Sequence, residues 1–283
     1  MNNQLQSKPK FSLAIQSDGY KKLINNTLGD SKRAAKFIAA ISSAVAVNPS
    51  LQECDAGTIL SGALLGEALG LSPSPQLAHY YLVPYKIKNS DGTFSDRAQF
   101  QLGYKGYIQL AIRSGQYKDI DVIEVREGEY LGRDKLTGKH KFEFIEDEVE
   151  RENKSIIGYM AYFEYLNGFY KNLYWSKEKM QKHALEYSQA YASDIKKKTS
   201  YSFWSKDFNG MAFKTMLRQL ISKWGIMSID MQEALSKDMS VVREDGSYDY
   251  VDNQPVILQN EKTTSEETKD GTIKTKQVDI NEL

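Results

Sequence analysis

The sequence predicts an α+β protein, and three observations support this class. Two segments with helix caps and breakers open the chain, at residues 30–48 and 55–73. Residues 77–175 are rich in β-branched and aromatic residues and contain an Asp-Gly turn at 91–92, which indicates a central antiparallel sheet with a hairpin. After residue 175 the pattern turns helical again. Because helices and strands occur in separate runs, the predicted class is α+β.

The elements follow in order along the chain. The first helix starts at a cap, Asp30 or Ser31, and ends before Pro49. The second starts at Asp55 and ends before Pro73, and its many small residues predict close packing against a neighbour. The expected strands lie at 77–86, 97–104, 117–131, 139–150, 155–166 and 168–175. Helix 176–192, a basic aromatic loop at 193–208 and a long amphipathic helix at 207–225 complete the core.

Composition limits the class of protein. The chain has 283 residues, of which 41% are hydrophobic and one is cysteine. A single cysteine excludes an internal disulfide framework and is typical of a reducing compartment. No apolar run reaches the ~20 residues of a membrane span, and the N-terminus lacks the apolar core of a signal peptide. We therefore expect a cytoplasmic protein without a membrane partner.

The net charge of zero conceals an asymmetry. Residues 241–283 carry 5 Lys/Arg and 10 Asp/Glu, whereas residues 171–218 carry 10 Lys/Arg and 4 Asp/Glu. An acidic tail after a basic body is common in nucleic-acid proteins. From about residue 240 the chain is poor in bulky apolar residues, so we expect a disordered tail. The predicted organisation is an arm at 1–28, a core at 29–239 and an acidic tail at 240–283.

The long helix carries the first candidate site. Lys206, Lys214 and Arg218 are spaced in multiples of four, which places them along one helix face. Lys214 and Arg218 lie about one turn apart, close to the spacing of adjacent phosphates, and Thr215 can donate a further hydrogen bond. This face would meet either solvent or a polyanion, and the sequence of the helix by itself is consistent with both.

The preceding loop favours the polyanion. It alternates cations, hydroxyls and aromatic rings: Lys196, Lys197, Lys198, Thr199, Tyr201, Phe203 and Trp204. Backbone neutralisation together with stacking is how proteins hold single-stranded nucleic acid. No base-reading pattern is present, so we expect binding without sequence preference.

A second candidate site is the turn Gly-Tyr-Lys-Gly at residues 103–106. Glycines without a Cβ permit a close backbone, and a helix N-terminus beside Lys105 suits a phosphate. We hypothesise that a DNA backbone lies here, with Arg113 holding another phosphate two turns on. The alternative is a strand-to-helix turn that needs glycine only for its shape.

Sequence motifs for ATP binding and zinc binding are absent, and the signal for a nuclease centre is incomplete. There is no phosphate-binding ATP loop, since "TGKHK" at 137–141 lacks both the leading glycine and the hydroxyl. The three histidines are far apart, so a zinc site is not expected. A nuclease centre built on Asp119, Asp121 and Glu124 stays open, although the lysine expected after the second acid is missing.

Four stretches together resemble one family: GALLGEALGLSP (62–73), HYYLVPY (79–85), QFQLGYKGYIQLAIRSGQY (99–117) and MAFKTMLRQLISKWG (211–225). They are similar to the RecT family of phage single-strand annealing proteins, in the RecT/Redβ superfamily. The similarity covers about residues 30–235. It implies a protein of phage homologous recombination that pairs complementary DNA strands without ATP in a bacterial host. It also implies a homo-oligomer in rings or helical filaments, a groove between strand hairpins and a long helix, and no catalytic residues.

The expected sites and partners follow from both lines of reasoning. The resemblance carries the DNA-binding role to Lys105, Arg113, Lys214, Thr215 and Arg218. The chemistry of the residues extends that role to Gln101, Tyr104, Lys198, Thr199 and Lys206. Expected partners are single-stranded DNA, nascent duplex, further copies of the chain, a phage exonuclease and, through the tail, the host single-strand-binding protein. No cofactor is expected, with magnesium at most a modulator.

Four other functions remain open from the residues alone. A coating protein would bind single strands without annealing them, and a metal-dependent nuclease would cleave them. An RNA-binding module is suggested by the G-x-x-G form of "GYKG", but the strands are too many for one KH unit. A structural phage protein would use oligomerisation alone.

Overall fold

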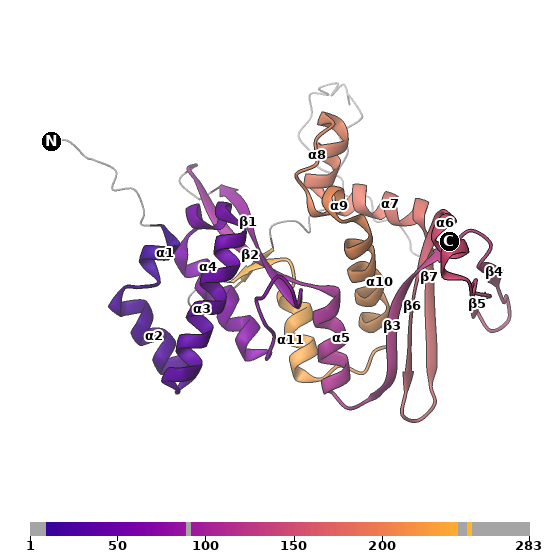
Figure 1. Cartoon of the computed structure of the whole chain (residues 1–283), viewed down its shortest axis with the longest axis horizontal. Helices are drawn as coiled ribbons and strands as arrows, with labels where there is room; N and C mark the ends of the chain where they lie inside the picture. Colours follow the sequence, from indigo (N-terminus) through magenta and orange to yellow (C-terminus); the bar gives the residue numbers. More distant parts are fainter. Residues whose placement is uncertain (1–9, 89–91, 243–247, 251–283) are drawn as a thin grey trace, which may run out of the picture.

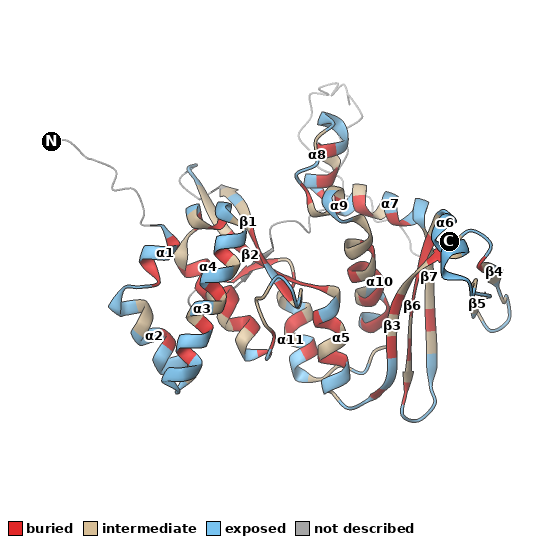
Figure 2. Cartoon of the chain, in the orientation of Figure 1, coloured by how far each residue is buried: buried red, intermediate tan, exposed pale blue. Residues whose placement is uncertain are grey.

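The computed structural model describes residues 10–88, 92–242 and 248–250. In Figure 1 the N-terminal helices and a first sheet lie at one end of the molecule, and a second sheet lies at the other. Helices α5, α10 and α11 stand between them. Figure 2 shows that buried residues concentrate on the strands and on the facing sides of these helices. The mixture of helices and antiparallel sheets confirms the α+β class.

The N-terminal end is helical. Its elements are α1 (Phe11–Ala14), α2 (Asp18–Leu28), α3 (Ser31–Val47), the 3-10 helix η1 (Pro49–Glu53) and α4 (Ala56–Ala68). The predicted caps are present, because Asp30 accepts from Lys32 N–H and Asp55 accepts from Gly57 N–H. Phe11, Ile15 and Ile24 are buried in the main core. The described part of the predicted arm therefore packs against the body.

The first sheet has the strand order β1-β2-β8-β9, and its strands are β1 (Tyr80–Lys88), β2 (Phe94–Leu102), β8 (Ser240–Val242) and β9 (Tyr248–Tyr250). The β1–β2 hairpin runs antiparallel from the pair Tyr80 and Leu102 to the pair Lys88 and Phe94. Helix α4 packs on it closely, since a Cβ on Gly66 would meet the Tyr80 ring. The small residues of α4 thus serve core packing, as expected.

The strands after the hairpin form separate sheets, so the prediction of one meandering sheet is wrong. The second sheet has the order β3-β6-β7, and β4 pairs with β5 alone. Their bounds are β3 (Tyr117–Arg126), β4 (Tyr130–Arg133), β5 (His140–Phe142), β6 (Ile156–Tyr165) and β7 (Tyr170–Ser176). Helix α5 (Tyr104–Arg113) separates β2 from β3, and the free edge of β2 is taken by β8. The strands that follow β2 in the sequence therefore cannot pair with β2 and extend the first sheet.

One predicted strand is partly a helix. Residues 148–150 begin α6 (Glu148–Asn153), and Asp147 caps this helix by accepting from Glu150 N–H. Carboxylates in the first turn also favour the positive end of the helix dipole. Local capping chemistry therefore outweighs the strand-like composition of this segment.

The C-terminal helices are α7 (Lys177–Tyr187), α8 (Gln189–Lys197), α9 (Phe203–Lys206), α10 (Phe208–Trp224) and α11 (Ile229–Lys237). Helix α10 is the predicted long helix, and it packs on β3, β6, β7 and α5. The predicted loop 193–208 contains the end of α8 and all of α9. Residues 240–242, the start of the predicted tail, form a buried strand. Residues 243–247 and 251–283 lie outside the described residues.

The turn at residues 103–106 is glycine-rich because the chain itself passes there. A Cβ on Gly103 would meet the carbonyl oxygen of Ala78, and a Cβ on Gly106 would meet that of His79. Gly103 N–H also donates to His79 O at 2.8 Å. The close backbone at these glycines is therefore the chain's own segment before β1.

The substitution Gly106→Ala tests this packing. The added Cβ meets backbone, which cannot rotate away, so we expect the free energy of unfolding to fall by about 1–3 kcal/mol. Gly19→Ala on α2 is the matched control, because nothing lies within 4 Å of its Cβ. The control should be neutral or more stable by up to about 1 kcal/mol. Urea denaturation measures both, and equal stability of the two variants would contradict the packing.

Candidate nucleic-acid interface

Three adjoining hollows run along α10: two lie between the β1–β2 hairpin and the α8–α9 segment, and the third lies beside α7. Their volumes are ≈ 410, ≈ 390 and ≈ 250 Å³, and Met211 lines all three. We call this feature the central groove. Seven of the predicted site residues line it: Gln101, Tyr104, Thr199, Lys206, Lys214, Thr215 and Arg218. Residues from three separate segments of the sequence are thus brought together.

The floor of the groove is organised by a residue that the sequence analysis missed. Asp238 is fully buried at the end of α11, and its carboxylate accepts four hydrogen bonds. The donors are Lys214 Nζ at 2.9 Å, Arg218 Nη1 at 2.6 Å, Leu102 N–H at 2.8 Å and Tyr107 hydroxyl at 2.9 Å. The two cations of the predicted helix face therefore share one internal carboxylate.

This pairing changes the charge that the groove presents. Lys214 is only 5% exposed, so it does not lie on a solvent-facing stripe, whereas the Arg218 side chain is 31% exposed. Burial by itself would raise the pKa of Asp238, but Lys214 and Arg218 outweigh it and hold that pKa below its usual value. Burial lowers the pKa of Lys214, and Asp238 opposes this shift. With all three groups ionised, the cluster keeps one net positive charge.

A second buried carboxylate shapes the basic aromatic loop. Asp194 accepts from the Thr199 hydroxyl at 2.6 Å, from Ser202 N–H at 2.7 Å and from the Ser205 hydroxyl at 2.7 Å. The Thr199 hydroxyl bond, followed by those of Ser202 and Ser205, holds the pKa of Asp194 below its usual range. The loop is thus a defined structure, with Lys198 exposed at the left-handed residue that ends α8.

Two further groove residues, Thr215 and Gln101, also have internal partners. Thr215 donates to the carbonyl of Met211 one turn earlier, at 2.9 Å. The buried Gln101 amide donates to Gln99 Oε1 at 2.6 Å. Lys206 is exposed, and neither an ion pair nor a hydrogen bond of its ammonium group is found among the described residues. Lys206 is therefore the predicted cation most accessible to a ligand in the groove.

Three predicted residues, Lys105, Arg113 and Lys198, lie outside the described lining of the central groove. Arg113 donates to Leu69 O at 2.8 Å and to Gly70 O at 3.3 Å, which ties the end of α5 to the end of α4. Lys105 is exposed and borders a separate hollow of ≈ 280 Å³ beside Leu77. The two candidate sites predicted from the sequence are therefore separate: Lys214 and Arg218 line the central groove, whereas Lys105 and Arg113 do not.

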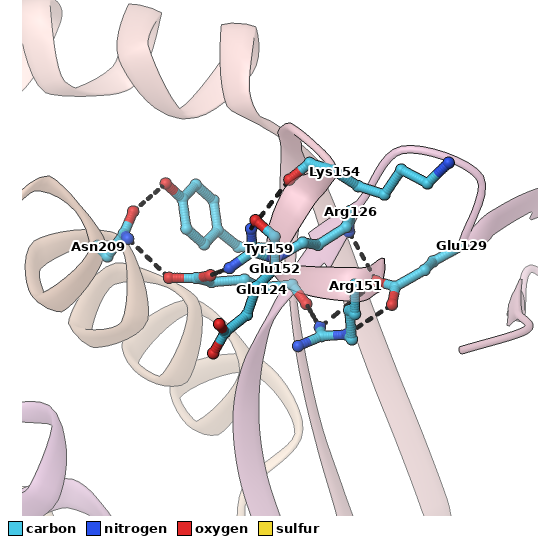
Figure 3. Close-up of polar contacts among 8 residues, drawn as sticks. All are labelled: Glu124, Arg126, Glu129, Arg151, Glu152, Lys154, Tyr159 and Asn209. Carbon is cyan, nitrogen blue, oxygen red and sulfur yellow. Dashed lines mark hydrogen bonds and ion pairs between the residues drawn. The ribbon is translucent and has the colours of Figure 1, made fainter. Parts of the chain in front are cut away.

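The acidic positions of the nuclease alternative have structural partners. Glu124 accepts from Asn209 Nδ2 at 2.6 Å and from Arg126 Nη2 at 3.0 Å, in the network of Figure 3. Asp119 accepts from the Tyr162 hydroxyl at 3.0 Å. Within the described part of the chain, no group of three or more His, Cys, Asp or Glu side chains could hold a metal ion.

The same network joins the second sheet to its neighbours. Glu129 is fully buried and accepts from Arg151 Nε on α6 at 2.6 Å and from Arg126 N–H at 2.7 Å. Asn209, in the first turn of α10, accepts from the Tyr159 hydroxyl at 2.7 Å (Figure 3). These bonds connect α6, β3, β6 and α10, so the carboxylates here have a structural role in joining the second sheet to α6 and α10.

Comparison with known proteins adds an independent observation. Residues 35–256 match the model of the RecT family, which is more than half of the chain. The chain belongs to the RecT family. It is 37% identical to YqaK of Bacillus subtilis (strain 168) over 244 residues, 84% of this chain and 78% of YqaK. It is 28% identical to RecT of Escherichia coli (strain K12) over 211 residues, 72% of this chain and 71% of that protein.

Membership of the RecT family confirms the resemblance found in the sequence. The family implies single-strand annealing in phage-type recombination, with annealing proteins rather than classical enzymes as its members. It also suggests binding of single-stranded DNA and oligomerisation. In this RecT-family protein, none of the helices among the described residues is both long and apolar enough to cross a membrane.

Replacing Asp238 tests the organisation of the groove floor. Asp238→Asn removes the charge that compensates the buried Lys214, so we expect the free energy of unfolding to fall by about 3–5 kcal/mol at pH 7. Asp230→Asn is the control, because Asp230 is exposed and its Arg113 partner is 3.8 Å away. This control should change the free energy of unfolding by less than about 1 kcal/mol.

The pH dependence has a definite sign. An unfolded aspartate has a pKa of about 3.9, and the folded pKa of Asp238 lies lower. The stabilisation is therefore present above about pH 4 and is lost as the pH falls through the folded pKa. The free energy of unfolding, measured by urea denaturation at a series of pH values, should fall more steeply below about pH 4 for the wild type than for Asp238→Asn. If the free energies of unfolding of the two proteins depend on pH in the same way, the assignment of a charged Asp238 is wrong.

Proposed function

We propose that this protein anneals complementary DNA strands without ATP and holds the nascent duplex in the central groove. The observation that supports the proposal most directly is the excess of cations along the groove. Lys86, Lys197, Lys206, Lys214 and Arg218 line it, against two lining carboxylates, Asp194 and Asp207. Both of these carboxylates accept backbone N–H bonds, Asp207 as the cap of α10.

The groove residues divide into two roles in this proposal. Lys206 in the groove and Lys198 outside its described lining are both exposed, and they would contact phosphates of the first strand directly. Arg218 would add a preformed charge at the floor, where Asp238 fixes its position. Lys214 would contribute through the net charge of the cluster. We assign Arg113 to holding α5 against α4 and keep Lys105 as a peripheral phosphate contact.

Base pairing would supply the specificity. Phosphate contacts position a strand without reading its sequence, so the base edges are left for the incoming strand. The cationic groove reduces the repulsion between the two backbones as they approach. We propose no cofactor, with magnesium as a modulator through the phosphates. The host single-strand-binding protein and a phage exonuclease are proposed partners, the former through residues outside the described ranges.

Annealing over long strands requires many subunits. Two regions at opposite ends of the folded molecule carry opposite charges and could join neighbouring subunits. Residues 10–48 carry six Lys/Arg and two Asp/Glu, whereas residues 143–154 carry six Asp/Glu and two Lys/Arg. The two regions lie at opposite ends of the molecule in Figure 1, and most of their charged residues are exposed. Exposed apolar side chains accompany them, such as Val47 and Val149. We propose head-to-tail association through these ends, in a ring or filament.

A sequential-strand experiment tests the function. A labelled strand is added without ATP, followed by its complement, a non-complementary strand or nothing, and preformed duplex is compared. We expect a salt-resistant complex only after the two complementary strands arrive in turn. Equal complexes with and without the complement would identify a coating protein instead. Shortening of the labelled strand in magnesium or manganese would identify a nuclease.

Salt dependence measures the proposed phosphate contacts. The log–log slope of affinity against salt is about −0.7 per neutralised phosphate of a single strand. Lys206→Ala should weaken binding and make the slope shallower by about that amount. Lys135→Ala, at an exposed lysine in the turn between β4 and β5 and outside both proposed association surfaces, is the control and should leave the slope unchanged. Identical slopes for the Lys206 variant and the wild type would remove Lys206 from the interface.

Charge reversal tests the proposed association. Replacing Glu146 and Glu148 by lysine, or Lys32 and Lys36 by glutamate, brings the net charge of that region from −4 or +4 to zero. The loss of attraction should weaken assembly about tenfold or more in sedimentation at low salt. Mixing the two variants should restore one complementary junction and give hetero-dimers. Wild-type assembly of either variant alone, or no recovery on mixing, would contradict this geometry.

A further inference from the structure

One wall of the central groove is aromatic and has no part in the phosphate contacts. The hollow of ≈ 390 Å³ is lined by Trp175, His183 and Tyr187 on one side and by Thr215 and Arg218 on the other. The Trp175 and His183 ring centroids are 5.2 Å apart, and those of His183 and Tyr187 are 4.5 Å apart. We call these three rings the aromatic wall.

The secondary structure explains this row of rings. Trp175 lies near the end of β7, and α7 starts two residues later under the cap Ser176. His183 and Tyr187 are four residues apart on α7, so they lie on one helix face. Lys179, one turn earlier on that face, places its ammonium 4.3 Å from the centre of the Trp175 ring. A cation over the ring helps to hold the indole in place.

The aromatic wall lies at the edge of the core and is partly accessible, since Trp175 packs against the core as a half-buried side chain. Tyr187 is 44% exposed, and Trp175 and His183 are partly exposed. The buried rings nearby, such as Trp204, belong to the main core instead. The accessible faces of these rings, in a hollow that Arg218 also lines, form a surface suited to a flat, polar ligand.

We propose that this hollow is a nucleobase-stacking site, in which one base of the bound strand packs on the aromatic wall while its phosphate lies toward Arg218. The volume of the hollow falls within the roughly 300–1,000 Å³ range of small-molecule sites. Stacking uses the face of a base and is tolerant of sequence, so the pairing edge stays free for the complementary strand. The inference rests on the proposed function and adds a base contact to it.

Abasic DNA separates stacking from phosphate binding. We would measure the affinity of the full chain for an oligothymidine and for an abasic oligonucleotide of the same length and phosphate number. The wild type should prefer the oligothymidine by about tenfold. Tyr187→Leu should reduce this ratio several-fold with the salt slope unchanged, and Tyr187→Phe should retain it, because the ring rather than the hydroxyl stacks.

A matched control and the contrary outcomes complete the design. Tyr170→Leu removes a 38%-exposed ring from β7, outside the described lining of the groove, and should keep the wild-type ratio. If the wild type binds both oligonucleotides equally, or Tyr187→Leu keeps the full ratio, the stacking site is wrong while DNA binding stands. If the wild type binds neither oligonucleotide, the proposed function fails and the stacking site fails with it.

Discussion

The buried carboxylate of Asp238 is the interaction on which the groove depends. It joins the end of β2 through Leu102 N–H, the helix α5 through Tyr107 and the helix α10 through Lys214 and Arg218. A carboxylate at this depth is costly unless its partners are all in place, so the bonds favour one arrangement of these elements. Met239 follows directly and donates its N–H to Phe100 O, so the same turn also brings β8 to the edge of β2.

This cluster gives the groove two kinds of positive charge. The pair at the floor is fixed and partly neutralised, and the lysines at the rim are exposed and mobile in the ordinary way of long side chains. In the proposed function, the fixed floor would position a strand, whereas the exposed lysines would adapt to a backbone that changes from single strand to duplex. The aromatic wall would add a surface for base faces. A groove of this kind suits a ligand whose base edges must remain available.

The sequence was most reliable where short-range chemistry decides the structure. The caps Asp30 and Asp55, the helix-ending prolines and the hydrophobic stripe of the long helix located α3, α4 and α10 to within a few residues. Prediction from the sequence failed where a segment far along the chain determines the pairing of a strand or the packing around a residue. The edge of β2 is occupied by a strand about 140 residues later, so no pattern in the strands themselves revealed two sheets. The glycines at 103 and 106 likewise accommodate residues 78 and 79, which only the fold brings near.

The sequence by itself determined the fold class, most of the elements, the RecT-family resemblance and the set of cations available for a polyanion. The tertiary structure decided which of those cations are accessible to solvent and which are held by internal partners. Lys206 is exposed, Arg113 is used by backbone carbonyls and Lys214 is buried against Asp238, although all three look alike as basic residues on helices or beside them. The physical reason is that a helical period fixes only the direction of a side chain. Whether its charge meets water or a carboxylate 24 residues away depends on packing between elements.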